Sequence, residues 1–303
     1  MTALFDRLVV MTLPLVPRAL VGRVASRYVA GDTLDDALAT VRALAKEGAM
    51  ATLDILGESV TRPEQTEATR DQYLGMIDAI VASGLPANIS VKPTAVGLAI
   101  DPALAFRNCA SICARAEAHG MFVRLDMEDS PYTEKTLRLA LDLKAKFPAV
   151  GVVIQAYLKR SLRDLDPLIA AGMNLRICKG IYVEPRTIAW KDRATVIASF
   201  AALVDKHLSA GCYVGIATHD EACVERALAT IDRLKLSPDL YEFQMLLGVD
   251  PVLRRGLLAA GHRLRVYVPY GRDWYAYSTR RLKETPSIAR HVVRATLGFG
   301  PAS

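Results

Sequence analysis

The chain has 303 residues, of which 51% are hydrophobic and 23% are charged, and its formal net charge at pH 7 is +6. This composition excludes a disordered or fibrous protein, and the length suits one α/β barrel, which takes about 250 residues. Five cysteines without a CxxC pair favour free thiols and disfavour a disulfide scaffold or a zinc site.

The first predicted element is an apolar N-terminal segment. Charges and prolines interrupt residues 1–17 at Asp6, Arg7, Pro14 and Pro17, so the segment falls short of the roughly 20 apolar residues that span a bilayer. It also lacks the positive region and the cleavage site of a signal peptide. We expect an amphipathic helix that packs on the body of a cytoplasmic protein and could touch a membrane surface.

This segment is the start of a helical extension, expected over residues 1–50, which precedes a single barrel domain over residues 51–303. Within the extension, Asp32 or Thr33 is a suitable N-cap for a helix that runs to Lys46. No linker separates the two parts.

Short runs rich in Val, Ile and Leu recur through the rest of the chain, each followed by a segment of helical periodicity. We predict eight strands, at residues 51–56, 88–92, 122–126, 152–155, 174–178, 213–218, 241–245 and 264–268. The helices predicted between them cover residues 102–119, 133–147, 164–171, 194–210, 221–235 and 251–260. This alternation indicates an α/β fold of the (β/α)8 TIM-barrel type. A doubly wound sheet is the alternative, which the absence of GxGxxG and GxxxxGK(S/T) phosphate loops disfavours.

Residues suited to ligand binding stand at or just after the C-terminal ends of the predicted strands. They are Lys92, Asp126, Met127, Glu128, Gln155, Lys179, Thr218, His219, Asp220, Gln244, Tyr267 and Tyr270. In a (β/α)8 barrel these ends converge on the face that carries the active site. The opposite strand ends, at Ala51, Asn88, Val123 and Val152, hold little comparable chemistry. The sequence therefore predicts one site at the C-terminal face.

The segment after the last strand is strongly basic. Residues 254–294 hold ten Lys or Arg against only Asp273 and Glu284, so this end should attract an acidic substrate, a cofactor pyrophosphate or an anionic membrane. Nucleic acid is disfavoured because no motif for it appears. Arg280 and Arg281 form an adjacent pair that could bind a carboxylate or phosphate, with Glu284 one turn later to orient or gate it. We expect this last helix to lie over the C-terminal face.

Seven sequence blocks carry a resemblance to a known family. They are ISVKPTAVGL, FVRLDMED, VIQAYL, LRICKGIY, GIATHD, YEFQMLLG and VYVPYGRDWYAYSTRRLKE, and the match runs in order from Ile89 to about Leu297. The chain thus resembles the proline dehydrogenases, both the short monofunctional bacterial enzymes and the corresponding barrel of the bifunctional proline utilisation proteins.

The resemblance implies a non-covalent FAD across the strand ends. The positions that match the family's cofactor contacts are Met127, Gln155, Arg176, Lys179, Gly180, Ile181, Thr218 and His219. Arg176 matches the arginine near the flavin N5 and is expected to be catalytic. Val183 departs from the large aromatic or charged residue that relatives often place near the adenine.

The resemblance also implies a substrate site. Lys92, Arg280 and Arg281 match the cluster that binds the substrate carboxylate. Asp126 matches an acidic residue close to that lysine and to the reacting centre and is expected to be catalytic, and Tyr267 matches an aromatic residue that packs on the pyrrolidine ring. Glu284 matches the partner of an arginine gate.

The implied function is FAD-dependent oxidation of L-proline to 1-pyrroline-5-carboxylate, with electrons passed to a quinone, as the first step of proline degradation. No metal is expected. A Schiff-base lyase or aldolase with Lys92 or Lys179 as nucleophile is an alternative. A flavin- or ligand-binding barrel without turnover is a third hypothesis.

Overall fold

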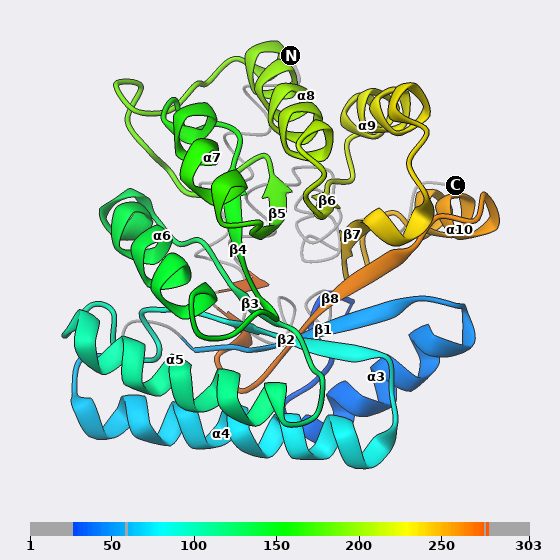
Figure 1. Cartoon of the computed structure of the whole chain (residues 1–303). Coiled ribbons are helices and arrows are strands. Elements are labelled where there is room, and N and C mark those ends of the chain that lie inside the picture. The colour runs from blue at the N-terminus through cyan, green and yellow to red at the C-terminus, as the bar shows by residue number, and fades with distance from the viewer. Residues whose placement is uncertain (1–26, 58–59, 276, 279–303) are drawn as a thin grey trace, which may run out of the picture.

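The computed structural model describes residues 27–57, 60–275 and 277–278 (Figure 1). Eight parallel strands form a closed barrel in sequence order, and β8 closes it by pairing with β1. The strands are β1 (Met50–Ile55), β2 (Ala87–Val91), β3 (Val123–Leu125), β4 (Val150–Gln155), β5 (Asn174–Cys178), β6 (Val214–Ala217), β7 (Tyr241–Leu246) and β8 (Leu264–Tyr270). The (β/α)8 prediction is confirmed, and the doubly wound sheet is wrong.

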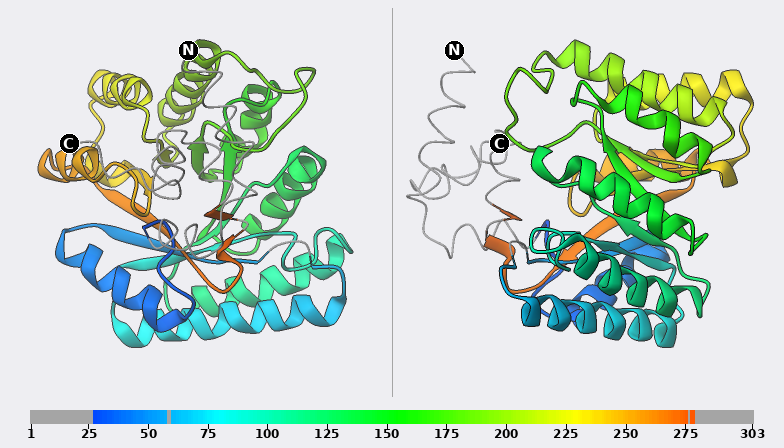
Figure 2. Two further views of the ribbon diagram at one scale, coloured as in Figure 1. Left: turned by 180° about the vertical axis from the view of Figure 1, so that it is seen from behind. Right: turned by 60° about the vertical axis from the view of Figure 1, so that its left-hand side comes forward.

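Helices surround this barrel in the views of Figures 1 and 2. They are α3 (Leu34–Lys46), α4 (Pro63–Ser83), α5 (Pro102–Glu117), α6 (Ser130–Lys144), α7 (Ser161–Ala170), α8 (Arg193–Ser209), α9 (Glu221–Leu234) and α10 (Pro251–Ala259), with a 3-10 turn η2 (Pro238–Leu240). Among the helices of the described ranges, none has the length and apolar character needed to cross a membrane.

Helix α3 precedes β1 in the chain and packs against β1 and β8. The Thr33 hydroxyl accepts a hydrogen bond from the Asp36 amide at 3.2 Å, and the Asp36 carboxylate accepts one from the Thr33 amide at 3.1 Å. This reciprocal cap starts the helix where the sequence predicted it. Residues 1–17 and the predicted last helix beyond Ser278 lie outside the described residues, and the division at residue 50 stays a prediction.

The inside of the barrel is polar. Arg176 of β5 donates to Asp126, which directly follows β3, and to Gln244 of β7. Because β5 neighbours neither β3 nor β7, these bonds cross the interior. Alternation along the strands then points Leu125 and Ile177 outward, into the apolar core between sheet and helices. The interior of such a barrel is usually filled by Val, Ile and Leu. Its polar filling here indicates a functional site.

Two glycines make room for this polar filling. A Cβ at Gly151 of β4 would collide with the Arg124 guanidinium, and a Cβ at Gly215 of β6 would collide with the Gln244 amide. Arg124 instead donates to the Asn174 carbonyl oxygen at 2.6 Å. The missing side chains on β4 and β6 therefore let long polar side chains from β3 and β7 lie across the barrel.

Candidate active site

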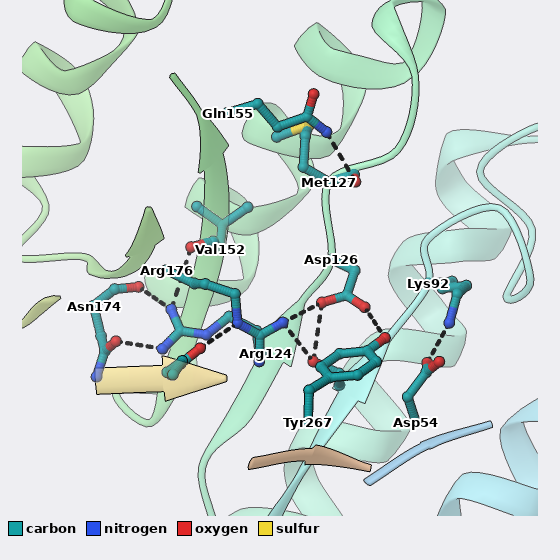
Figure 3. A network of polar contacts seen from close by, with 12 residues as sticks. Asp54, Lys92, Arg124, Asp126, Met127, Val152, Gln155, Asn174, Arg176 and Tyr267 are labelled. Atoms are coloured by element: carbon teal, nitrogen blue, oxygen red, sulfur yellow. Dashed lines mark hydrogen bonds and ion pairs between the residues drawn. The ribbon is translucent and has the colours of Figure 1, made fainter. Parts of the chain in front are cut away.

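The carboxylate of Asp126, just after β3, is the centre of a network at the C-terminal end of the barrel (Figure 3). Its Oδ1 accepts hydrogen bonds from Arg176 Nη1 at 2.7 Å and from the Ser90 hydroxyl at 2.9 Å. Its Oδ2 accepts one from the Tyr267 hydroxyl at 2.8 Å. Donors from β2, β5 and β8 thus fix both oxygens of the Asp126 carboxylate.

The Tyr267 hydroxyl donates to this carboxylate as a neutral phenol. Burial, reinforced by the charges of Asp126 and Asp54, raises the pKa of Tyr267 well above its ordinary value. The phenol therefore keeps its proton at neutral pH. The Arg176 guanidinium lies over the face of its ring, with the central carbon 5.2 Å from the ring centroid. The hydroxyl of Tyr267 thus contacts Asp126 and its ring contacts Arg176.

Arg176 is held from two sides. Nη1 donates to Asp126 and, at 3.1 Å, to the Ser90 hydroxyl, while Nε donates to the Gln244 side-chain oxygen. The Gln244 amide in turn donates to Glu242 at 2.5 Å, which fixes which of its atoms faces Arg176. A positive charge at the centre of the barrel is thereby fixed in one orientation, as electrostatic stabilisation of a reacting group requires.

Lys92, directly after β2, forms an ion pair with Asp54 of β1 (Figure 3). The lysine side chain is 9% exposed and the aspartate side chain is 0% exposed. Lys92, Asp126, Arg176 and Tyr267, all predicted site residues, are thus brought to one end of the barrel.

Asp54 and Ser90 are members of this network that the sequence prediction missed. Asp54 is the one acidic residue in the run MATLDI of β1, and a charged residue in an otherwise apolar strand is a signal that could have found it. Ser90 is two residues before Lys92, so alternation along β2 turns both toward the interior. Both residues lie inside strands, whereas the prediction searched strand ends.

Asp220 contacts two of the predicted cofactor residues, Lys179 after β5 and Thr218 after β6. Lys179 Nζ lies 2.9 Å from one Asp220 oxygen, and Arg193 lies 2.8 Å from the other. The Asp220 amide donates to the Thr218 hydroxyl at 3.0 Å. His219 Nε2 accepts a hydrogen bond from the Leu246 amide at 2.8 Å, so its proton is on Nδ1.

Gly180 sits in this segment in a conformation that favours glycine, with φ of +104°. A Cβ there would overlap the Tyr157 ring. The chain therefore needs glycine at this point. The Tyr157 amide donates to the Lys179 carbonyl oxygen at 2.8 Å, which holds Lys179, Gly180 and the half-buried Ile181 beside the end of β4.

Gln155 and Met127 meet at the other side of the site. The Gln155 amide donates to the carbonyl oxygens of Met127 and Glu128, each at 3.1 Å. Its Oε1 is buried and, among the described residues, accepts no hydrogen bond. An oriented, unused acceptor in this position is suited to a ligand N–H group.

The other predicted residues, Arg280, Arg281 and Glu284, lie outside the described residues. Elsewhere in the described chain, no three His, Cys, Asp or Glu side chains gather as metal ligands would.

Known proteins resemble this chain over most of its length. The profile of the family described as "Proline dehydrogenase" matches residues 37–294. A proline dehydrogenase from Deinococcus radiodurans is 40% identical over 278 residues, which cover 90% of both chains. Proline dehydrogenase 1 from Bacillus subtilis (strain 168) is 35% identical over 273 residues, again 90% of both chains.

Solved structures resemble the fold. Proline utilization A from Bdellovibrio bacteriovorus, inactivated by N-propargylglycine, superposes with a TM-score of 0.82 at 21% identity. The match covers 92% of this chain and 34% of that one, so this chain spans about a third of the larger protein. The matched profile and the two relatives confirm the resemblance of the seven blocks: the chain belongs to the proline dehydrogenase family.

Proposed function

We propose that this protein oxidises L-proline to 1-pyrroline-5-carboxylate with FAD as cofactor and a quinone as the final electron acceptor. Family membership supports proline oxidation in proline catabolism. The observation that carries the finer proposal is the network of Asp126, Arg176 and Tyr267, which sets a fixed cation and an aromatic ring at one end of the barrel.

Charge balance supports a substrate with its own carboxylate. In the Asp126 network and the ion pair beside it, two cations, Lys92 and Arg176, meet two anions, Asp54 and Asp126. These four charges already cancel, so a bound carboxylate needs further positive charge. Arg280 and Arg281 are the residues that we propose for this, with Glu284 balancing the pair when no substrate is present.

The residues present fit a flavin. The Tyr157 ring lies directly against the Gly180 backbone and so fixes the course of the segment from Lys179 to Ile181, and the buried Gln155 Oε1 offers an acceptor for a ring N–H. Arg176 offers a positive charge whose position is fixed by its hydrogen bonds. We propose that Met127, Gln155, Arg176, Lys179, Gly180, Ile181, Thr218 and His219 hold the cofactor. When bound, FAD would supply the redox chemistry: the proline ring would give it a hydride and release a proton from its nitrogen, and the two electrons would pass to a quinone, which takes up two protons.

The protein's own contribution is to bind and orient proline. Lys92 and the arginine pair would hold the carboxylate, and Tyr267 would support the pyrrolidine ring from one face. With these groups fixed, the ring carbon beside the nitrogen has one orientation, and the reaction becomes a positioned, effectively unimolecular step. Arg176 would stabilise the negative charge that accumulates as electrons arrive.

The Schiff-base alternative is less suited to this geometry. A lysine nucleophile must be a neutral amine, whereas Lys92 is paired with Asp54 and Lys179 is paired with Asp220. Both ion pairs favour the ammonium form, which has no lone pair to attack a carbonyl.

An assay of turnover tests the proposal. The purified protein, incubated with L-proline and a soluble quinone, should consume both in equal amounts, and o-aminobenzaldehyde should trap the pyrroline product. Colourless protein that forms a borohydride-reducible adduct on Lys92 or Lys179 would instead establish the lyase.

We further propose that the enzyme works in the cytoplasm and contacts the membrane surface where its quinone resides. The basic region of residues 254–294, with ten Lys or Arg against two acidic residues, supports this contact.

A further inference from the structure

Asp54 is an acid inside the barrel that the proposed function counts only in the charge balance, with no part in binding proline. Its side chain is 0% exposed, and its Oδ1 accepts a hydrogen bond from Lys92 Nζ. Within the described residues its other oxygen, Oδ2, is buried and accepts no hydrogen bond. Burying a carboxylate destabilises the folded protein unless a partner offsets the lost hydration. A buried Asp54 that uses only one of its two oxygens therefore calls for a functional reason.

The burial of Lys92 gives a reason for placing an aspartate against it. A side chain that is only 9% exposed favours the neutral amine, because burial penalises the charged form. A neutral Lys92 could not attract a carboxylate. An aspartate against it reverses this preference, because the two opposite charges stabilise each other.

We propose that Asp54 is a positioning residue for the substrate: its carboxylate holds Lys92 in place as an ammonium ion that can bind the carboxylate of proline. This inference rests on the proposed function and deepens it. Asp54 does not itself touch the substrate; it acts through Lys92.

The charges around Asp54 at a given pH depend on the titratable groups that face it. They are Lys92 from the end of β2, Asp126 from the end of β3, Tyr73 from α4, and Tyr267 and Tyr270 from β8. Burial raises the pKa of Tyr73 and Tyr267 well above the ordinary value and that of Tyr270 to about 12, so all three stay neutral up to pH 9. Asp126 already accepts three hydrogen bonds from other residues.

Asp54 itself is ionised at pH 7 and above. Burial raises its pKa to about 6, with Lys92 lowering it and Asp126 raising it. Between pH 7 and pH 9 the carboxylate therefore carries its charge and supports the ammonium form of Lys92. Replacing it by an amide leaves the lysine buried without that charge.

The test measures binding of a probe to the flavin-loaded protein. Cyclopentanecarboxylate has the ring size and carboxylate of proline but no nitrogen, so between pH 6.5 and pH 8.5 it neither titrates nor reacts. Calorimetry of the wild-type protein should give a Kd that changes by less than threefold over this range. In Asp54→Asn the Kd should rise at least tenfold from pH 6.5 to pH 8.5, because Lys92 loses its proton.

Three further variants complete the test. Asp164→Asn also removes a buried carboxylate from an ion pair, that with Arg160, and should leave the Kd independent of pH. Asp54→Glu keeps the charge and should restore pH independence. If Asp54→Asn does not fold, Lys92→Met can be compared with the double variant Lys92→Met/Asp54→Asn, which lacks both charges. Their Kd values for the probe should be equal, because Asp54 acts only through Lys92.

The inference would be overturned if Asp54→Asn raised the Kd by the same factor at every pH. It would also be overturned if the double variant bound the probe ten times more weakly than Lys92→Met. If the wild-type protein neither binds the probe nor is reduced by proline, the proposed function fails as well. If the wild type does both and Asp54→Asn shows no pH dependence, only the role of Asp54 fails.

Discussion

Gly180 is the backbone position on which the proposed cofactor site depends most. Its φ of +104° is one that L side chains rarely adopt, and a Cβ would overlap the Tyr157 ring. Any side chain here must displace either the tyrosine or the segment from Lys179 to Ile181. The site should therefore be sensitive to the smallest possible addition.

Gly180→Ala is expected to yield a folded protein that retains little flavin. The added methyl group pushes the segment away from Tyr157 without removing any polar contact, and the flavin-to-protein absorbance ratio after purification measures the result. Gly172→Ala is the matched control, because Gly172 also has positive φ, +57°, but nothing lies within 4 Å of its Cβ position. Full flavin content in Gly180→Ala would count against a cofactor at this segment.

The pattern of strand ends predicted much of the site, but the pairing of its charged residues did not follow from the sequence. Lys92 and Asp126 stand at strand ends and lie in the network. Asp54 pairs with Lys92 across 38 residues, and Asp220 pairs with Lys179 across 41. Such pairs depend on the register of the closed barrel, which no local pattern contains. The roles of Arg280, Arg281 and Glu284 stay predictions.

At the scale of elements, the sequence predicted the eight strands because each is an apolar run between helical segments. It did not predict α4. The buried residues Tyr73, Met76, Ile77 and Ile80 have helical spacing, but they occupy only the second half of that helix, and Thr66 alone is buried before them. Strand β8 extends to Tyr270, beyond the predicted end at residue 268, because Tyr270 pairs with Ile55 of β1. That extension follows from barrel closure, which is not local.

Helix α8 carries a buried histidine that should make stability depend on pH. His207 Nε2 donates to the Met173 carbonyl oxygen at 2.8 Å, so the ring anchors α8 to the residue before β5. Burial lowers the pKa of His207 to about 4. A group whose pKa is lower in the folded state supports folding above its unfolded value, near 6.5, and that support is lost as pH falls toward 4.

His207→Gln tests this dependence, because glutamine can donate to the same carbonyl oxygen but does not titrate. Between pH 7 and pH 5 the free energy of unfolding of the wild type should fall by on the order of 2 kcal/mol more than that of the variant. Urea unfolding at the two pH values measures this. Equal losses in both proteins would show that His207 can be protonated without cost in the folded state.

At the scale of the whole molecule, net charge and its distribution bear on membrane contact. The formal charge is +6, and the excess is concentrated in residues 254–294. At low salt the protein should sediment with anionic vesicles and not with neutral ones, and 0.5 M salt should release it, because such attraction is screened within a few ångströms. Protein that stays in the supernatant with anionic vesicles would argue against this contact.

The barrel as a whole gathers at one end the side chains of the Asp126 network and the Lys92–Asp54 pair, for which we propose the reaction above. Anaerobic titration of the purified protein with L-proline, followed by absorbance, tests that proposal most directly. The account predicts a yellow protein whose flavin absorbance near 450 nm bleaches on addition of proline and returns when a quinone is added. A protein without flavin, or a flavin spectrum that saturating proline leaves unchanged, would contradict it.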